Sequence, residues 1–131
     1  MKPEAAAYLD KARESLDEAR KIYEIGLASV AARSAYYAGF HAAEAFIISR
    51  TGKIAKSHGG VRSEFSRLAK DTPQVDQGFT TFLAQAYKYK EIGDYAVGTG
   101  AIITLSTADD AIKTAARLID CIAEILGHEP D

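Results

Sequence analysis

A stripe of polar side chains runs along an otherwise apolar segment, residues 29–50, and its residue types suit contacts to phosphate. At about 100° of rotation per helical residue, Arg33, Tyr37, His41 and Glu44 fall within roughly 80° of one another. Glu44 lies three residues after His41, so its carboxylate can orient the imidazole and favour the protonated form. Arg33 beside Tyr37 suits contacts to a phosphate and a base. The stripe therefore predicts a polar cleft or dimer seam; the alternative is a solvent-exposed helix face.

A second candidate site follows directly along the chain. Lys56, His58 and Arg62 surround the pair Gly59 and Gly60 at the start of the next apolar pattern. Free backbone N–H groups and the helix dipole at a helix N-terminus bind anions, and the cations add local positive charge. The sequence thus predicts a phosphate site here. The alternative is that Ser57 caps the helix, the glycines allow a tight entry and the cations are ordinary surface charge.

The elements that must position these residues are helices. Apolar residues recur at three- and four-residue spacing in residues 3–26, 29–50, 61–68 and 79–93, and again from residue 107. Gly26 and Gly52 are expected helix stops, and Thr107 with Asp110 resembles a capping box for the last helix. Ile102, Ile103 and Leu105 are expected to form an extended connection, and residues 128–131 a frayed tail. We expect an all-α, up-and-down bundle of four to five helices in a single domain, residues 1–131.

Composition narrows the function classes. The 131 residues carry a net charge of −2, so attraction to nucleic acid requires a local basic patch. The single Cys121 excludes an intramolecular disulfide and is expected in the core, and three scattered histidines give no metal-ligand spacing. No secretory signal or membrane span is expected. We therefore expect a cytoplasmic protein without metal or other cofactor.

Three stretches, RSAYYAGFHAAEA (33–45), KSHGGV (56–61) and KYKEIGDY (88–95), give the chain a family resemblance. In this order they resemble the HEPN superfamily, in particular its small stand-alone prokaryotic members. The resemblance covers nearly the whole chain. It implies a homodimer, association with RNA or a nucleotide, and pairing with a minimal nucleotidyltransferase in toxin–antitoxin or defence systems.

The resemblance also implies a catalytic motif that this chain does not carry. HEPN ribonucleases have an arginine, four to six intervening residues and a histidine near the end of the fourth helix. Arg33 and His41, like Arg50 and His58, are separated by seven residues and precede that helix. The expected place holds Lys90, Asp94 and Tyr95. Lysine lacks the bidentate phosphate geometry of arginine, and an unperturbed aspartate has a pKa of about 3.9.

The function predicted from the sequence is therefore an RNA- or nucleotide-associated HEPN protein of a toxin–antitoxin or defence-type pair, without the usual ribonuclease motif. One alternative is a metal-independent endoribonuclease with a degenerate site, in which Lys90, Asp94 and Tyr95 act together with His41 or His58. The other is a helical dimerisation module with no role in nucleic-acid binding. Aromatic surface from Tyr36, Tyr37, Tyr87 and Tyr89 favours the homodimer.

Overall fold

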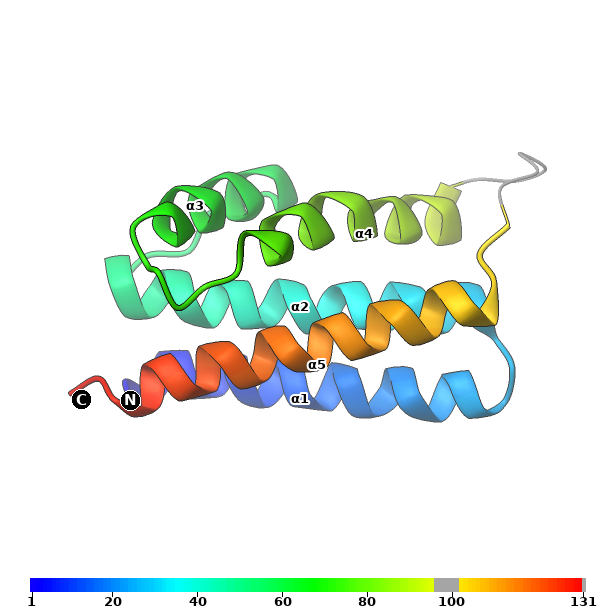
Figure 1. Ribbon diagram of the computed structural model, residues 1–131, viewed down its shortest axis with the longest axis horizontal. Coiled ribbons are helices and arrows are strands. Elements are labelled where there is room, and N and C mark those ends of the chain that lie inside the picture. The colour runs from blue at the N-terminus through cyan, green and yellow to red at the C-terminus, as the bar shows by residue number, and fades with distance from the viewer. Residues whose placement is uncertain (96–101, 131) are drawn as a thin grey trace.

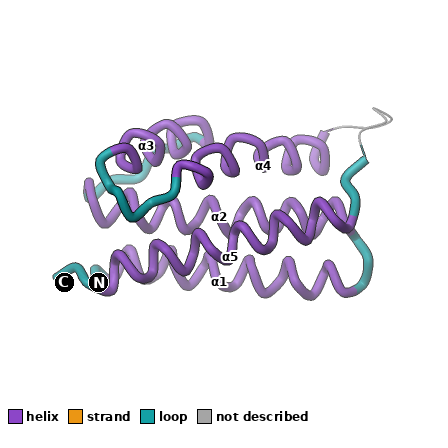
Figure 2. Tube along the Cα trace, in the orientation of Figure 1, coloured by secondary structure: helices purple, strands orange, loops and turns teal. Residues whose placement is uncertain are grey.

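Five helices form an all-α bundle in the computed structural model, which describes the backbone of residues 1–95 and 102–130 and the side chains of residues 1–92 and 102–130. The helices are α1 (Pro3–Glu24), α2 (Ala28–Thr51), α3 (His58–Lys70), α4 (Gln77–Tyr95) and α5 (Leu105–Gly127). Consecutive long helices alternate in direction, as the sequence predicted (Figure 1). The shorter α3 lies beside the start of α4, at the end of the bundle that also holds both termini (Figure 2).

The central helix is α2, which packs against every other helix. Small residues on its surface let the neighbouring helices approach closely. Gly39 is the clearest case: a Cβ at this position would lie 2.8 Å from Cε2 of Phe82 in α4 and 3.5 Å from Cδ2 of Leu118 in α5. The distance to Phe82 is shorter than any ordinary contact, so a side chain here would force Phe82 to shift. The glycine therefore brings α4 and α5 onto the same stretch of α2.

Most helix ends lie where the sequence placed them. Gly26 and Gly52 have positive φ angles of 82° and 74°, the left-handed conformation that glycine adopts at little cost. Ser57 caps α3, because its side-chain oxygen accepts a hydrogen bond of 2.9 Å from the Gly60 N–H.

The start of α5 differs from the prediction. Thr104, not Thr107, is the N-cap, and its hydroxyl accepts a hydrogen bond of 3.1 Å from the Thr107 N–H. Leu105 thus belongs to the first turn of the helix, whereas residues 102–104 are non-helical. The first turn was missed because Leu105 and Ser106 are exposed and give no buried face for a periodicity to detect.

The sequence predicted a frayed C-terminal tail, but the structure anchors this tail through Glu129. The Glu129 carboxylate accepts hydrogen bonds from the Ser49 hydroxyl and the Arg50 guanidinium at the end of α2. Lys2 donates to the Ser49 carbonyl oxygen at 3.0 Å, so both ends of the chain are fastened to the same turn. Among the helices described, none is both long and apolar enough to cross a membrane.

Candidate functional site

The polar stripe of α2 faces the interior rather than the solvent at its second half. His41 and Glu44 are only 9% and 8% exposed, and His41 Nδ1 lies 2.7 Å from Glu44 Oε1. The solvent-face interpretation is therefore wrong for this pair. Tyr37 and Arg33, about one and two turns before His41, are half-buried, and the Arg33 guanidinium lies 5.9 Å from the Tyr37 ring centroid.

Next to this stripe, the first residue of α3 inserts its side chain among aromatic rings. The His58 imidazole stacks on Phe40, with ring centroids 4.4 Å apart. Tyr37 and Tyr87 flank it at 5.9 and 5.5 Å, and the Tyr36 hydroxyl lies 2.7 Å from His58 Nδ1. We call these five residues, Tyr36, Tyr37, Phe40, His58 and Tyr87, the aromatic cluster. It joins α2, α3 and α4.

The surroundings of His58 favour its neutral form. Burial lowers the pKa of His58, and the nearby charges of Lys90 and Arg62 lower it further, whereas Glu44 acts in the opposite direction. Burial raises the pKa of Tyr36 far above its usual value, so its hydroxyl keeps its proton.

These protonation states determine which of the two side chains, Tyr36 or His58, donates the hydrogen bond between them. Within the described part of the chain, the Tyr36 hydroxyl has His58 Nδ1 as its hydrogen-bond acceptor. The hydroxyl therefore donates to Nδ1 of the neutral imidazole, which leaves the ring proton on Nε2.

Two cations lie against Tyr87, the member of the cluster that comes from α4. The Arg62 guanidinium is 4.3 Å and the Lys90 ammonium 5.8 Å from the Tyr87 ring centroid. Arg62 comes from the second turn of α3 and Lys90 from the C-terminal half of α4. The Arg62 guanidinium also acts on the Tyr36 hydroxyl, whose pKa it lowers against the larger effect of burial. Its buried Nη1 makes no hydrogen bond within the described part of the chain. Positive charge and half-buried aromatic rings therefore share one surface, an arrangement that fits a phosphate next to a base.

Comparison with known proteins places the chain in a family. The family model described as "HEPN domain" matches residues 5–126. The chain belongs to the HEPN family. A UPF0332 protein of Gloeobacter violaceus is 28% identical over 128 residues, covering 98% of this chain and all of the relative. A Methanocaldococcus jannaschii protein named "Putative toxin" is 25% identical over 126 residues, covering 96% of this chain and 91% of the relative.

The fold of this HEPN domain is also seen in a solved structure. The protein TT1696 from Thermus thermophilus superposes with a TM-score of 0.80, covering 94% of this chain and 98% of the other. The two sequences are 21% identical, so the likeness concerns the fold. The all-α bundle expected from the sequence is therefore confirmed.

The HEPN fold brings together candidates that the sequence placed in separate sites. Tyr37 and His41 from the stripe, His58 and Arg62 from the second candidate, and Lys90 from the third all lie at or beside the aromatic cluster. Asp94 and Tyr95 belong to the last turn of α4 by their backbone, but their side chains lie outside the described residues.

The predicted anion site at the α3 N-terminus is only partly supported. The Gly60 N–H is taken by the Ser57 cap, and a Cβ on Gly60 would lie 3.0 Å from both Ala55 Cβ and Ser57 Oγ. Gly60 is thus explained by packing and capping. Lys56 and Gly59 are exposed. His58 and Arg62 point into the aromatic cluster, so the cationic surface lies along α3 and α4 rather than at the helix end.

Two members of the cluster, Tyr36 and Phe40, were not expected to belong to a site. The sequence assigned Tyr36 to an exposed dimer surface, but its side chain is fully buried, which corrects that assignment. Both residues lie at the edge of the polar stripe on the helical wheel, within roughly one residue's rotation of it. A wider angular window would have included them. Nothing in the sequence indicated that His58 would contact them.

Proposed function

We propose that this HEPN protein is the RNA-binding component of a two-protein toxin–antitoxin or defence pair, and that it binds single-stranded RNA at the aromatic cluster. The relative named "Putative toxin" supports the paired system. The predicted partner is a minimal nucleotidyltransferase. Co-purification of the products of adjacent reading frames tests this pairing, and a chain that elutes alone from such a co-expression contradicts it.

The observation that carries the RNA proposal is the meeting of Arg62 and Lys90 on the ring of Tyr87, in a chain of net charge −2. The two cations come from different helices, so their proximity is a product of the fold. Their charges also lower the pKa of His58, which is the effect of a positive local potential. Phosphate oxygens would bind these cations, while unstacked bases would stack on the half-buried rings of Tyr37 and Tyr87.

RNA binding is tested by charge-neutralising variants with matched controls on the same helices. Arg62→Gln and Lys90→Gln are compared with Arg67→Gln on α3 and Lys88→Gln on α4, both exposed. Fluorescence anisotropy with a short single-stranded RNA should show about tenfold weaker binding for each site variant and a salt dependence shallower by about one unit. The controls should bind like wild type. Equal effects at site and control positions would show that Arg62 and Lys90 act only as ordinary surface charge.

A second candidate function is metal-independent RNA cleavage, and the state of His58 favours it. A neutral imidazole next to two cations has the parts for proton transfer and for charge stabilisation at a phosphate. The missing arginine–histidine motif makes this the second choice. RNA gels in the presence of EDTA compare wild type with His58→Gln, His41→Ala, Asp94→Ala and Tyr95→Phe. Cleavage lost in one of these variants would promote the ribonuclease.

The remaining alternative is an interaction module without a nucleic-acid role. Wild-type protein that neither binds nor cleaves RNA in these two assays would support that module and contradict the proposal.

A further inference from the structure

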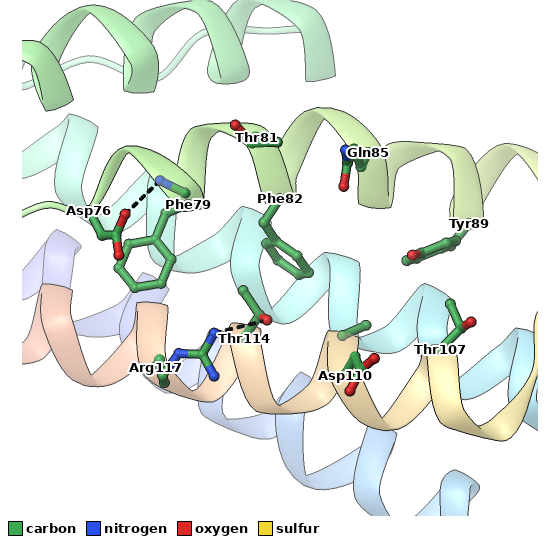
Figure 3. Close-up of a pocket in the computed structure, with 12 residues that line it drawn as sticks. Asp76, Phe79, Thr81, Phe82, Gln85, Tyr89, Thr107, Asp110, Thr114 and Arg117 are labelled. Carbon is green, nitrogen blue, oxygen red and sulfur yellow. Dashed lines mark hydrogen bonds between the residues drawn. The ribbon is translucent and has the colours of Figure 1, made fainter.

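A groove runs between α4 and α5, and neither Arg62 nor Lys90 lines it. Figure 3 shows side chains of both helices facing each other across it. Both helices pack mainly against α2 and meet each other sparingly, which leaves an open groove of about 590 Å³. Phe82 lines it and lies close to Gly39 of α2.

The two walls of the groove differ in a way that suits a helix. Residues spaced along one face of α4 give an aromatic wall, and residues spaced along one face of α5 give a wall of small side chains. They are Phe79, Phe82 and Tyr89 on α4, and Thr107, Ala111 and Thr114 on α5. Phe79 and Ala111 are buried, so the accessible surface of the walls comes from the four half-buried residues. Small side chains let another helix approach closely, while aromatic rings provide apolar area for its side chains. This combination is typical of grooves that bind an amphipathic helix.

The charges around the groove select the kind of helix. Asp76 and Asp110 contribute two carboxylates, and Arg117 contributes one cation. Asp76 Oδ1 accepts a hydrogen bond of 2.7 Å from the Gly78 N–H, and Arg117 Nη2 donates to the Thr114 hydroxyl at 3.3 Å. The rim is therefore net negative. A helix with basic residues next to its apolar face complements it.

A second copy of this chain offers no suitable helix. The large hydrophobic side chains that are exposed in the described part of the chain are Ile25, Leu27, Val30, Ile102 and Leu105. All five lie in loops or in the first turn of a helix, at the end of the bundle opposite the termini (Figure 1). No described helix of the chain presents an exposed stripe of large apolar residues along its length.

We propose that the α4–α5 groove binds an amphipathic helix of a different protein, one with an aliphatic face flanked by lysine or arginine. Neither the aromatic cluster nor Arg62 and Lys90 line the groove, so the two activities can be separated. The groove thus gives the protein a place to hold a partner without covering Arg62 and Lys90.

The first test uses a synthetic helical peptide of about 20 residues, long enough to form several turns, with leucines on one face and lysines beside them. A charge-reversed peptide carries glutamates in place of the lysines. Wild-type protein should bind the basic peptide about tenfold more tightly, a difference of about 1.4 kcal/mol. Asp110→Lys, at an exposed position, should reverse this preference. Equal affinity of wild type for the two peptides, or an unchanged preference in Asp110→Lys, would overturn the proposal.

A steric variant tests the location of binding. Thr114→Trp fills the groove from the α5 wall, whereas Ala84→Trp adds the same side chain to α4 at an exposed position outside the groove. Binding of the basic peptide should be lost in the first and retained in the second, and the RNA affinity of Thr114→Trp should equal that of wild type. Wild-type peptide binding by Thr114→Trp would contradict the proposal.

The natural occupant is identified by a photoreactive amino acid at Gln85, an exposed residue of the groove, in the full chain expressed in its host. The expected crosslink is to a helical segment of another protein that has the predicted apolar and basic pattern. A crosslink to a second copy of the chain, or no crosslink beyond that seen from Ala84, would exclude the proposed partner.

Discussion

His58 is the residue through which the candidate site is organised. Its imidazole contacts three rings of α2 and one of α4, and it accepts the Tyr36 hydroxyl proton in a hydrogen bond of 2.7 Å. The ring is held neutral by burial and by the cations beside it. A neutral, oriented imidazole donates through Nε2 without adding charge, which suits a contact to a base or a phosphate oxygen.

The lowered pKa of His58 predicts a pH dependence of stability. In the unfolded chain this histidine has a pKa of about 6.5, whereas in the folded protein it titrates at lower pH. The unfolded state therefore takes up a proton first as pH falls. The stabilisation is complete above about pH 6.5 and is lost as pH falls through the folded pKa. Urea unfolding at several pH values should show a smaller loss on acidification for His58→Phe than for wild type.

The exposed His128 provides the control for this experiment. His128 lies on the surface, with Nε2 at 3.0 Å from Glu124 Oε1. His128→Phe should retain the wild-type loss of stability below about pH 6.5. An identical acid dependence in wild type and His58→Phe would show that His58 is not held neutral by the fold.

At the scale of the elements, the site depends on how closely α3 and α4 approach α2. Gly39 and the alanines of α2 set that distance, because they leave the neighbouring helices free to rest on its backbone. Tyr36 and Phe40 lie on either side of Gly39 in sequence, so the helix that admits α4 also carries the buried rings of the aromatic cluster.

Substitution of Gly39 should therefore destabilise the bundle. A Cβ at this position meets Cε2 of Phe82 at 2.8 Å, and Gly39→Val adds still more volume. Overpacking of this kind costs about 1–3 kcal/mol in the free energy of unfolding. Gly59→Val in α3 is the matched control, because the nearest atom to its Cβ lies at 3.9 Å. Thermal and urea unfolding measure both variants, and equal stability losses would argue against close packing at Gly39.

The observed start of α5 gives a second prediction for an element. Thr104→Ala removes the hydroxyl that accepts the Thr107 N–H, and loss of an N-cap costs about 1 kcal/mol. Thr107→Ala keeps that backbone donor and its acceptor, so it should cost clearly less. Urea unfolding of the two alanine variants tests the assignment, and a larger loss in Thr107→Ala would restore the start predicted from the sequence.

At the scale of the whole molecule, the predicted homodimer still needs a test. Tyr37 and Tyr87 are half-buried, and the exposed aliphatic side chains gather at one end of the bundle. Apolar surface concentrated in this way is typical of an interface. Size-exclusion chromatography with light scattering at micromolar concentration should give the mass of two chains. A stable monomer under these conditions would contradict the dimer and any site composed of two copies.

The helices and the family could be predicted before the bundle was known. Helical periodicity, Gly26, Gly52 and Ser57 indicate where the helices run and where most of them end, because these signals are local along the chain. The motifs in residues 33–45, 56–61 and 88–95 also indicated the HEPN family, which the match over residues 5–126 confirms. The missing first turn of α5 shows the limit of periodicity where a helix is exposed.

What the candidate residues do together depends on the packing of the helices. His41, His58, Arg62 and Lys90 belong to three separate stretches of the chain, and nothing local fixes the distance between them. Packing of α3 and α4 on α2 buries His41, encloses His58 in rings and brings both cations to Tyr87. Contacts between side chains far apart in sequence arise only when helices pack. They cannot therefore be predicted from charge and periodicity along the chain.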